Sequence, residues 1–455
     1  MQTSVFERFV AKSPISVMAR GMMERVLNPE QLNEWFENTA DKQYTRDLLF
    51  SSVFDIMSQV VLGSHRSVNA AYQSTEEDIG VSITSLYNKL NGIEVATSAE
   101  LVRYCAGQII PLIKGLGGFQ TPLVPGYHVK LLDGNCIEAS EHRIKELREL
   151  AAGALPGKSL VVLDPSLRIP IDVFPCEDGH AQERSLLGDV LSTVKAGDLW
   201  VADRNFCVLS FLFGINSRQA FFAIRQHGNL PFTKLGKEKA AGQTDTGKVF
   251  EQKILVVDKD GNELKLRRIR IRLKKATRDG DKDIFIIANL PKSSIHAKQI
   301  GVLYRKRWKI ETAFQELTEH LNSEINTLGY PSAALFGFCV ALVSYMIFAV
   351  VKAALSGVYG ANKIDNEVSG YYVADEISAT YRGMMIAVPE EEWLIFRKYT
   401  QSKLVAVLIQ LATKVKLSRF RKHPRGPKKP ATKRKNDPKH PHVSTARILA
   451  KRRSK

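Results

Sequence analysis

Cysteine is scarce in this sequence of 455 residues, and no two cysteines form a C-x-x-C pair. This spacing excludes a thiolate zinc knuckle and a disulfide framework, and it favours a reducing compartment. The start of the chain, MQTSVFERFVAKSP, lacks the basic, apolar and small-residue regions of a signal peptide. We therefore expect a cytoplasmic protein. The five cysteines are Cys105, Cys136, Cys176, Cys207 and Cys339.

Acidic residues are almost absent from the last 42 positions, where 17 Lys and Arg residues accompany only Asp437. The whole chain has 65 basic and 47 acidic residues, a net charge of +18, so nearly all of the surplus lies in this segment. A nearly neutral body with a cationic tail indicates a polyanionic partner, most simply nucleic acid. Because residues 415–455 are rich in Pro, Lys and Arg, we predict a basic extended tail. Its histidines, His423, His440 and His442, are interpreted as solvated rather than metal-binding.

One long hydrophobic run departs from this soluble pattern. Residues Ala333 to Val351 carry no charge, and about 19 apolar residues can span a bilayer. The alternative is a helix buried on all sides within a large domain. The run follows an amphipathic helix and has no aromatic or basic girdle before it. We therefore expect a core helix and no membrane partner.

The first 121 residues predict an N-terminal helical domain. Within it, Ser74 to Leu90 has the pattern of a helix-turn-helix, with Tyr87, Asn88 and Lys89 exposed on the second helix. An ordinary helical hairpin explains the segment equally well. We interpret the domain as a probable DNA-binding domain.

After Pro122 the pattern changes to alternating strands and helices, which predicts a mixed α/β sheet. We expect a catalytic core in two parts, residues 122–225 and 291–360, interrupted by a β-rich insertion at 226–290. The second part begins with a long helix, Ala297 to Asn326. A C-terminal helical segment, 361–414, precedes the tail. The expected strands of the first part are His128–Leu132, Ser159–Leu163, Ile169–Phe174, Leu199–Ala202 and Ala220–Ile224.

The insertion contains a hairpin whose second arm alternates apolar and basic residues. A period of two puts one kind of residue on each face of a strand, so this arm should have one apolar and one fully cationic face. Four like charges on one face repel one another, which favours a polyanion lying on them over simple solvation. The four basic residues are Arg268, Arg270, Arg272 and Lys274.

Two aspartates stand at the ends of predicted strands. Asp133 ends HVKLLDGN, and Asp203 ends LWVADRNF. Residues just past the carboxyl ends of parallel strands line the ligand crevice, and two carboxylates there call for a divalent cation between them. Taken singly, Asp133 could open an Asp-Gly turn and Asp203 could cap a helix.

A third carboxylate lies on the helix LYRKRWKIETAFQELTEHLN. At 100° per residue, Glu311 falls at the edge of the core stripe, on the same strip as Tyr304 and Arg307. A carboxylate beside a packed sheet, flanked by phosphate-binding groups, is the expected third ligand of a metal site for phosphodiesters. We therefore predict that Asp133, Asp203 and Glu311 form one catalytic and metal-binding set.

These motifs resemble those of a known family. The spacing Tyr304-x2-Arg307-x3-Glu311 resembles the Y-R-E-K signature of DDE transposases, in the bacterial insertion-sequence group typified by insertion sequence four. The DGN and DRNF stretches are similar to that family's two aspartate motifs, and the spacing of 70 and then 108 residues agrees. The resemblance covers about residues 120–455. One departure is Thr318, where the family has a phosphate-contacting Lys that Lys309 or Lys306 could replace.

The resemblance implies a ribonuclease-H-like core that binds two Mg²⁺ ions, or Mn²⁺ in their place. It implies cleavage at insertion-sequence ends and strand transfer into target DNA by a cut-and-paste route, with double-stranded DNA as partner and a homodimer on the DNA. Tyr304, Arg307 and Lys309 would contact phosphates. A hairpin intermediate stays open, because the insertion offers only phenylalanines and no Trp to hold a flipped base. We expect a bacterial, nucleoid-associated protein.

Two other functions remain. The chain could be a DNA-binding repressor or relic that no longer catalyses, which Thr318 favours. It could also be a metal-dependent nuclease that cuts without joining.

Overall fold

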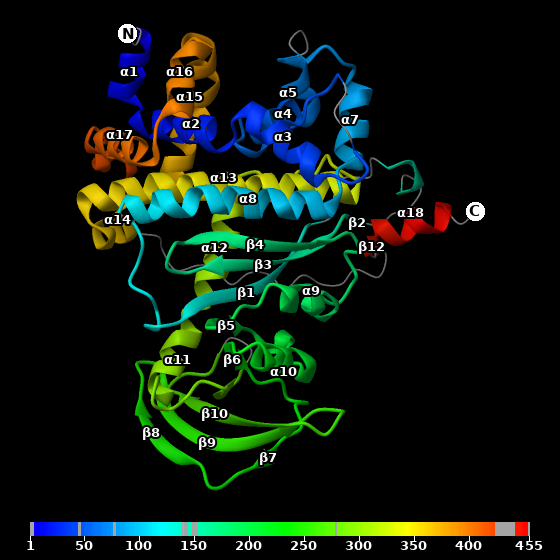
Figure 1. The fold of residues 1–455 in the computed structure, drawn as a ribbon, viewed down its shortest axis with the longest axis vertical. Coiled ribbons are helices and arrows are strands. Elements are labelled where there is room, and N and C mark those ends of the chain that lie inside the picture. The colour runs from blue at the N-terminus through cyan, green and yellow to red at the C-terminus, as the bar shows by residue number, and fades with distance from the viewer. Residues whose placement is uncertain are drawn as a thin grey trace.

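Ten strands form one continuous mixed sheet at the centre of the molecule (Figure 1). The computed structural model describes residues 4–43, 47–75, 79–138, 140, 144–147, 153–277, 280–423 and 442–453. The strand order is β4-β3-β1-β5-β6-β11-β10-β9-β7, and β8 pairs with β9. The strands are β1 (His128–Cys136), β3 (Lys158–Asp164), β4 (Ile169–Cys176), β5 (Asp198–Ala202), β6 (Phe221–Arg225), β7 (Thr233–Lys234), β8 (Lys239–Gln243), β9 (Gly247–Val257), β10 (Glu263–Leu273) and β11 (Asp283–Ala288).

The first five strands confirm the predicted mixed sheet. β3 is antiparallel to both of its neighbours, β1 and β4, and β5 and β6 run parallel to β1. Each predicted strand of this part lies within or overlaps an observed one. Pro170 and Pro175 lie in β4, which is tolerated because β4 is the edge strand and its outer side needs no backbone donors.

The predicted β-rich insertion forms its hairpin, but it continues the same sheet. β9 and β10 pair over eleven residues, and β11 joins them to β6. The turn between β9 and β10 is fixed by Asp258, whose carboxylate accepts backbone hydrogen bonds from Asp260 and Asn262, and by Gly261 at φ +82°. Strand pairing across β6–β11 therefore makes the insertion an extension of the core sheet.

Helices from both ends of the chain form a single layer on one side (Figure 1). α2 packs against α15, α16 and α17, so the two helical regions share one hydrophobic core. The predicted helical segment at 361–414 is divided into four helices. The helices of this layer are α1 (Ser4–Lys12), α2 (Pro14–Val26), α3 (Pro29–Thr39), α4 (Phe50–Val61), α5 (Val68–Gln73), α7 (Ile83–Gly92), α8 (Val95–Gly115), α14 (Ala361–Glu367), α15 (Gly370–Ala387), α16 (Glu390–Lys398) and α17 (Gln401–Thr413).

The hydrophobic run forms α13 (Pro331–Tyr359), a central helix that lies with α8 between the other helices and the sheet. α13 lies beside α8 and contacts β4, α4 and α17 (Figure 1). Of its most apolar 18-residue stretch, 94% is buried inside the protein. This burial matches the core-helix interpretation, because a helix apolar on all sides needs protein contacts on all sides.

The other face of the sheet has its own hydrophobic core under shorter helices. Trp200, Phe206, Phe211 and Phe222 are fully buried there. The covering elements are η2 (Glu183–Leu186), α9 (Leu187–Ser192), η3 (Arg204–Phe206) and α10 (Leu209–Ser217). The two faces of the sheet are therefore covered by different elements, one by α9 and α10 and the other by α11 (Ala297–Arg305), α12 (Trp308–His320) and α13.

The prediction of one long helix from Ala297 to Asn326 is wrong. The chain forms α11 (Ala297–Arg305) and α12 (Trp308–His320), separated by a turn at Lys306 and Arg307. The backbone N–H groups of these two residues bond three residues back, to Leu303 and Tyr304, instead of four. The break lets α11 pack on β6, β9 and β10 while α12 packs on β1 and α15.

The prediction of an extended tail is also wrong for residues 442–453. His442–Ser444 forms β12, which pairs in parallel with β2 (Gly153–Leu155), and α18 (Thr445–Arg453) follows. The remaining short turns are η1 (Lys145–Leu147) and η4 (Leu417–Phe420). Residues 424–441, with His440, lie outside the described residues, as do residues 76–78 of the predicted helix-turn-helix.

Candidate active site

Three neighbouring strands present polar residues at one sheet position. The parallel register pairs Leu132 with Ala202 and Ala202 with Ile224. The residues that directly follow these three in the sequence are Asp133, Asp203 and Arg225. Because alternate residues of a strand face opposite sides, Asp133 lies on the same face as Val129 and Leu131, beneath the long helices. The sheet therefore brings the two predicted aspartates together and adds an arginine.

The turn between α11 and α12 delivers a guanidinium to this position. Arg307 Nη1 lies 2.6 Å from Asp133 Oδ2, and Arg307 Nη2 contacts Glu311 Oε1 one helical turn further on. The Arg307 side chain is only 10% exposed. Asp133 and Glu311, 178 positions apart in the chain, therefore flank one buried cation.

The electrostatics of Asp133 reflect this crowding. Burial raises the pKa of Asp133 to about 7, and the negative charges of Asp203 and Glu311 act in the same direction. Arg307 and the backbone N–H of Gly134 oppose the rise. Burial on its own lowers the pKa of Arg307, but the surrounding negative charges, Asp133 foremost, outweigh it and raise the pKa above its ordinary value. The pKa of Asp133 thus responds to the charges of both other predicted carboxylates.

Tyr304 completes the cluster from the last turn of α11. Its ring is buried, and the Arg307 guanidinium lies 5.9 Å from the ring centre. Burial raises the pKa of Tyr304, Arg307 and Arg225 lower it, and Asp203 raises it. Arg225 is itself paired with Asp281 at 2.6 Å.

The donor chemistry of this cluster suits a hard divalent cation, because Mg²⁺ and Mn²⁺ prefer carboxylate oxygens. In the part of the chain that the structure describes, no three His, Cys, Asp or Glu side chains are close enough to share one ion. Arg307 stands between Asp133 and Glu311 and supplies the positive charge there. The Nε–H of Arg307 is buried and has no acceptor among the described residues.

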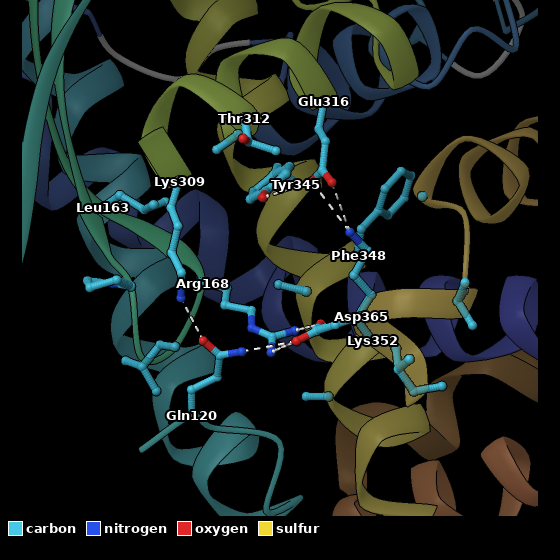
Figure 2. A pocket seen from close by; sticks show the side chains of 18 of the residues that line it. Gln120, Leu163, Arg168, Lys309, Thr312, Glu316, Tyr345, Phe348, Lys352 and Asp365 are labelled. Atoms are coloured by element: carbon cyan, nitrogen blue, oxygen red, sulfur yellow. Dashed lines mark hydrogen bonds and ion pairs between the residues drawn. The ribbon is translucent and has the colours of Figure 1, made fainter. Parts of the chain in front are cut away.

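Lys309 lies away from the carboxylates. It is half-buried, and its ammonium donates to Gln120 Oε1 at 2.6 Å on the far side of α12 (Figure 2). Burial, together with Arg168 and Lys306, lowers the pKa of Lys309 to about 8. Thr318, which stands where the resemblance expects a Lys, is exposed and donates to the carbonyl of Phe314.

The basic face of β10 lies on the other side of the sheet. Arg268 pairs with Ile287, Ile287 with Ile224, and these residues face the core beneath α9 and α10. The arginines there are already engaged. Arg268 lies 3.9 Å from the ring centre of Phe285, and Arg270 pairs with Glu238 and lies 4.5 Å from that of Phe250. Arg272 and Lys274 are exposed.

The predicted recognition helix corresponds to α7. Ser82 caps its start by accepting from the N–H of Ser85, and Gly80 ahead of it has φ +68°. Asn88 is exposed as predicted, whereas Tyr87 and Lys89 are half-buried and Lys89 lies over the ring of Phe36. α7 is compatible with either interpretation of this segment, whose residues 76–78 lie outside the described residues.

Comparisons with known proteins point to a transposase. Residues 129–347 match the family model described as a transposase DDE domain, and this segment contains Asp133, Asp203 and Glu311. The similarity therefore supports a transposase.

Particular relatives are more distant. "Putative transposase y4zB" of Sinorhizobium fredii is 24% identical over 197 residues, which are 42% of this chain and 52% of that protein. The chain thus spans about half the length of this curated relative. Among solved structures, a piggyBac transposase synaptic complex with hairpin DNA aligns over 94% of this chain and 90% of that chain, with 9% identity and a TM-score of 0.38.

One site residue was missed by sequence reasoning. Arg225 directly follows the predicted strand Ala220–Ile224, as Asp203 follows its own strand. The same strand-end rule that selected the aspartates would have selected Arg225 if it had been applied to basic as well as acidic residues.

Proposed function

We propose that the chain is a DNA transposase with a ribonuclease-H-like core, in which Asp133, Asp203 and Glu311 are the catalytic carboxylates. The observation that carries this proposal is that Asp133 and Glu311, far apart in sequence, both pair with Arg307, and that Asp203 follows the strand next to that of Asp133, inside the segment that matches the transposase DDE domain. The antiparallel start β1-β3-β4, followed by parallel β5 and β6 with helices between, supports the ribonuclease-H-like assignment.

The carboxylates would hold the divalent cations. When bound, a pair of Mg²⁺ ions, or Mn²⁺ in their place, would activate a water or a DNA 3′-hydroxyl for attack on phosphorus and stabilise the leaving oxygen. Asp133 lies in β1, Asp203 directly follows the adjacent strand β5 and caps η3, and Glu311 lies in α12, so two of the three ligands would be positioned by regular elements and the third by the end of a strand.

Arg307 would change partners during this chemistry. Without a divalent cation it neutralises Asp133 and Glu311. Once cations lie among the carboxylates, its guanidinium is no longer needed there and can grip a DNA phosphate with two parallel hydrogen bonds. Its buried Nε, which has no acceptor among the described residues, and the neighbouring Tyr304 and Arg225 would complete that phosphate site.

We further propose that the products are those of cut-and-paste transposition: cleavage at the element ends and joining of the 3′ ends to target DNA. Because two ends must be cut together, a dimer on DNA is expected. α7 and its neighbours would contact the ends, and Lys309, Arg272, Lys274 and the basic tail would add phosphate contacts. Such contacts position DNA without selecting sequence.

The test uses the full-length protein and a plasmid that carries the DNA flanking this gene on both sides. We expect Mg²⁺-dependent cleavage by the wild type and a loss of roughly a thousandfold or more for Asp133→Asn, Asp203→Asn and Glu311→Gln. Binding of end DNA in gel shifts should stay within about twofold, since Glu and Asp do not contact phosphates.

Glu319→Gln is the matched control, because Glu319 is an exposed acid on the same helix as Glu311. It should cleave like the wild type. A variant at one of the three carboxylates that retains cleavage would remove that residue from the set. Nicked DNA that is never joined to a target would instead identify a nuclease.

A further inference from the structure

A cavity of about 450 Å³ lies beside α12 (Figure 2). Lys309, Thr312 and Glu316 project into it from α12, half a helical turn away from Arg307 and Glu311. Its other walls come from α13, α14, the turn between β3 and β4, and the segment around Gln120. Parts of the chain that are distant in sequence thus build one pocket.

The lining combines an apolar floor with an excess of positive charge. Leu163, Phe348 and Ile364 are buried apolar residues of the floor. Six Lys and Arg residues line the cavity against two acids, Glu316 and Asp365.

Both of these acids are already neutralised. Glu316 pairs with Lys352 at 3.4 Å, and Asp365 pairs with Arg168. By contrast, no carboxylate of the described residues lies within 4 Å of the ammonium of Lys306 or Lys309. The positive charge of the cavity is therefore not balanced from within it.

A hydrogen-bonded chain holds these cations in place. Arg168 grips the Asp365 carboxylate with both terminal nitrogens, Gln120 Nε2 donates to the same carboxylate at 3.0 Å, and Gln120 Oε1 accepts from Lys309 (Figure 2). Arg168 has φ +62°, a left-handed conformation that is unfavourable for a residue with a side chain. The surrounding contacts hold the turn in this conformation with the Arg168 side chain lining the cavity. Strained backbone conformations of this kind are concentrated at ligand sites.

We propose that this cavity binds a nucleoside phosphate, with the phosphate on Lys306 and Lys309 and the base over the apolar floor. The volume falls within the range of about 300–1,000 Å³ that is typical of small-molecule sites. Trp308, 60% exposed at the rim, offers a ring on which a base can stack. A simple anion would leave the apolar floor uncovered, and an apolar ligand would leave the two lysines without a counter-charge.

This binding goes beyond the proposed strand chemistry and can be measured without it. The ligand could be a free nucleotide or the unpaired terminal nucleotide of a DNA strand, which share the same groups. Titrations in EDTA, where cleavage is suppressed, separate nucleotide binding from catalysis. A failure of nucleotide binding then leaves the assignment of the three carboxylates untouched.

The probes are adenosine, AMP, a blunt DNA duplex and the same duplex with a 5′-phosphorylated one-nucleotide overhang. Quenching of Trp308 fluorescence reports binding, because Trp200 and Trp393 are fully buried and Trp35 is half-buried. We expect AMP or the overhang duplex to quench, and adenosine to bind at least tenfold more weakly than AMP. AMP binding alone assigns a free nucleotide, and overhang binding in excess of blunt binding assigns a strand end.

Two kinds of variant test the location. Lys306→Gln and Lys309→Gln should each weaken binding by roughly tenfold, because each removes a charged hydrogen bond. Ala349→Phe should abolish it by filling the cavity. Lys298→Gln is the matched control, an exposed lysine on α11 outside the lining. Binding of none of the probes, equal binding of adenosine and AMP, or wild-type binding by Ala349→Phe in a protein with an unchanged melting temperature would each overturn the proposal.

Discussion

At the scale of single residues, the candidate site depends on Arg307 as the counter-ion of two carboxylates. Asp133 is 18% exposed and Glu311 is 36% exposed, so water screens the pair with Glu311 more than the pair with Asp133. Without the guanidinium, like charges would face one another in a half-buried place, which is unfavourable. The free energy of unfolding and metal affinity should therefore both respond to this residue.

We expect Arg307→Met to lower the free energy of unfolding by about 1–3 kcal/mol without divalent cations, since it leaves buried carboxylates unpaired. Mg²⁺ should recover more of this stability in the variant than it adds to the wild type, because only bound metal can then neutralise the acids. Thermal unfolding with and without Mg²⁺ measures both effects. Arg305→Met, two residues earlier and 44% exposed, is the control. Equal Mg²⁺ responses in all three proteins would contradict the exchange of partners.

A second prediction at the scale of single residues concerns the role of Arg225 in DNA cleavage. It lies beside Asp203 in register and influences Tyr304, yet it also pairs with Asp281. Arg225→Gln should reduce cleavage roughly 10–100-fold, the loss of one charged hydrogen bond to a phosphate, without abolishing metal binding. Single-turnover cleavage and Mg²⁺ titration measure the two separately. Asp281→Asn serves as the control for the ion pair: if it lowers cleavage as much, Arg225 acts only through the structure of the sheet.

At the scale of elements, β10 shows how a strand pattern can be right and its interpretation incomplete. The alternation of apolar and basic residues occurs as predicted, because a strand has a period of two. What the pattern does not contain is the partner side chains. Phe232, Phe250 and Phe285 come from neighbouring segments and pack against the guanidinium groups, and Glu238 and Asp283 pair with them.

The exposed and half-buried arginines of β10 should therefore behave differently. Arg270→Gln should cost about 1–2 kcal/mol in the free energy of unfolding, because it removes a stacking contact and an ion pair, whereas Arg272→Gln should stay within about 0.5 kcal/mol. Arg272 is 57% exposed and Arg270 is 18% exposed. Urea unfolding and DNA titration of both variants distinguish the roles. If Arg270→Gln and Arg272→Gln lost DNA affinity equally and neither lost stability, the basic face of β10 would instead bind DNA as a whole.

Local patterns predicted much of the fold, and the reason is physical. Strands such as β1 and β5, and the apolar helix α13, are encoded in short windows of sequence. Partner choice between distant segments is not. The pairing of β11 with β6, the break between α11 and α12, and the docking of β12 on β2 are all decided by tertiary contacts.

The same limit applies to the candidate site. Asp133, Asp203 and Glu311 could be selected from strand ends and a helical strip, each a local property. The direction of Lys309 could not, because it depends on Gln120 and on the α13 and α14 walls of the cavity. Nor could the placement of the β10 arginines on the opposite sheet face, since that follows from the pairings of four strands.

At the scale of the whole molecule, charge is divided between a nearly neutral body and a basic end. In the body, cations are matched locally by acids, as the pairs of Arg103 with Asp172 and Arg397 with Glu24 illustrate. The sequence of the tail offers no such matching, because residues 428–439 include six Lys and Arg residues and one Asp. Like charges with so few acids beside them in the sequence are best neutralised by phosphates, with release of condensed counter-ions from DNA.

Replacing the six basic residues of 428–439 with Gln should therefore weaken non-sequence-specific DNA binding and flatten its salt dependence. If each contacts one phosphate, the slope of log affinity against log salt concentration should fall by up to about 5. Affinity titrations on a random duplex from 50 to 200 mM salt measure the slope. Unfolding should be unchanged, since β12 and α18 lie beyond the altered stretch. An unaltered slope would place the salt-sensitive contacts on the body of the protein, and Arg272 and Lys274 of the β10 region would be the first residues to replace.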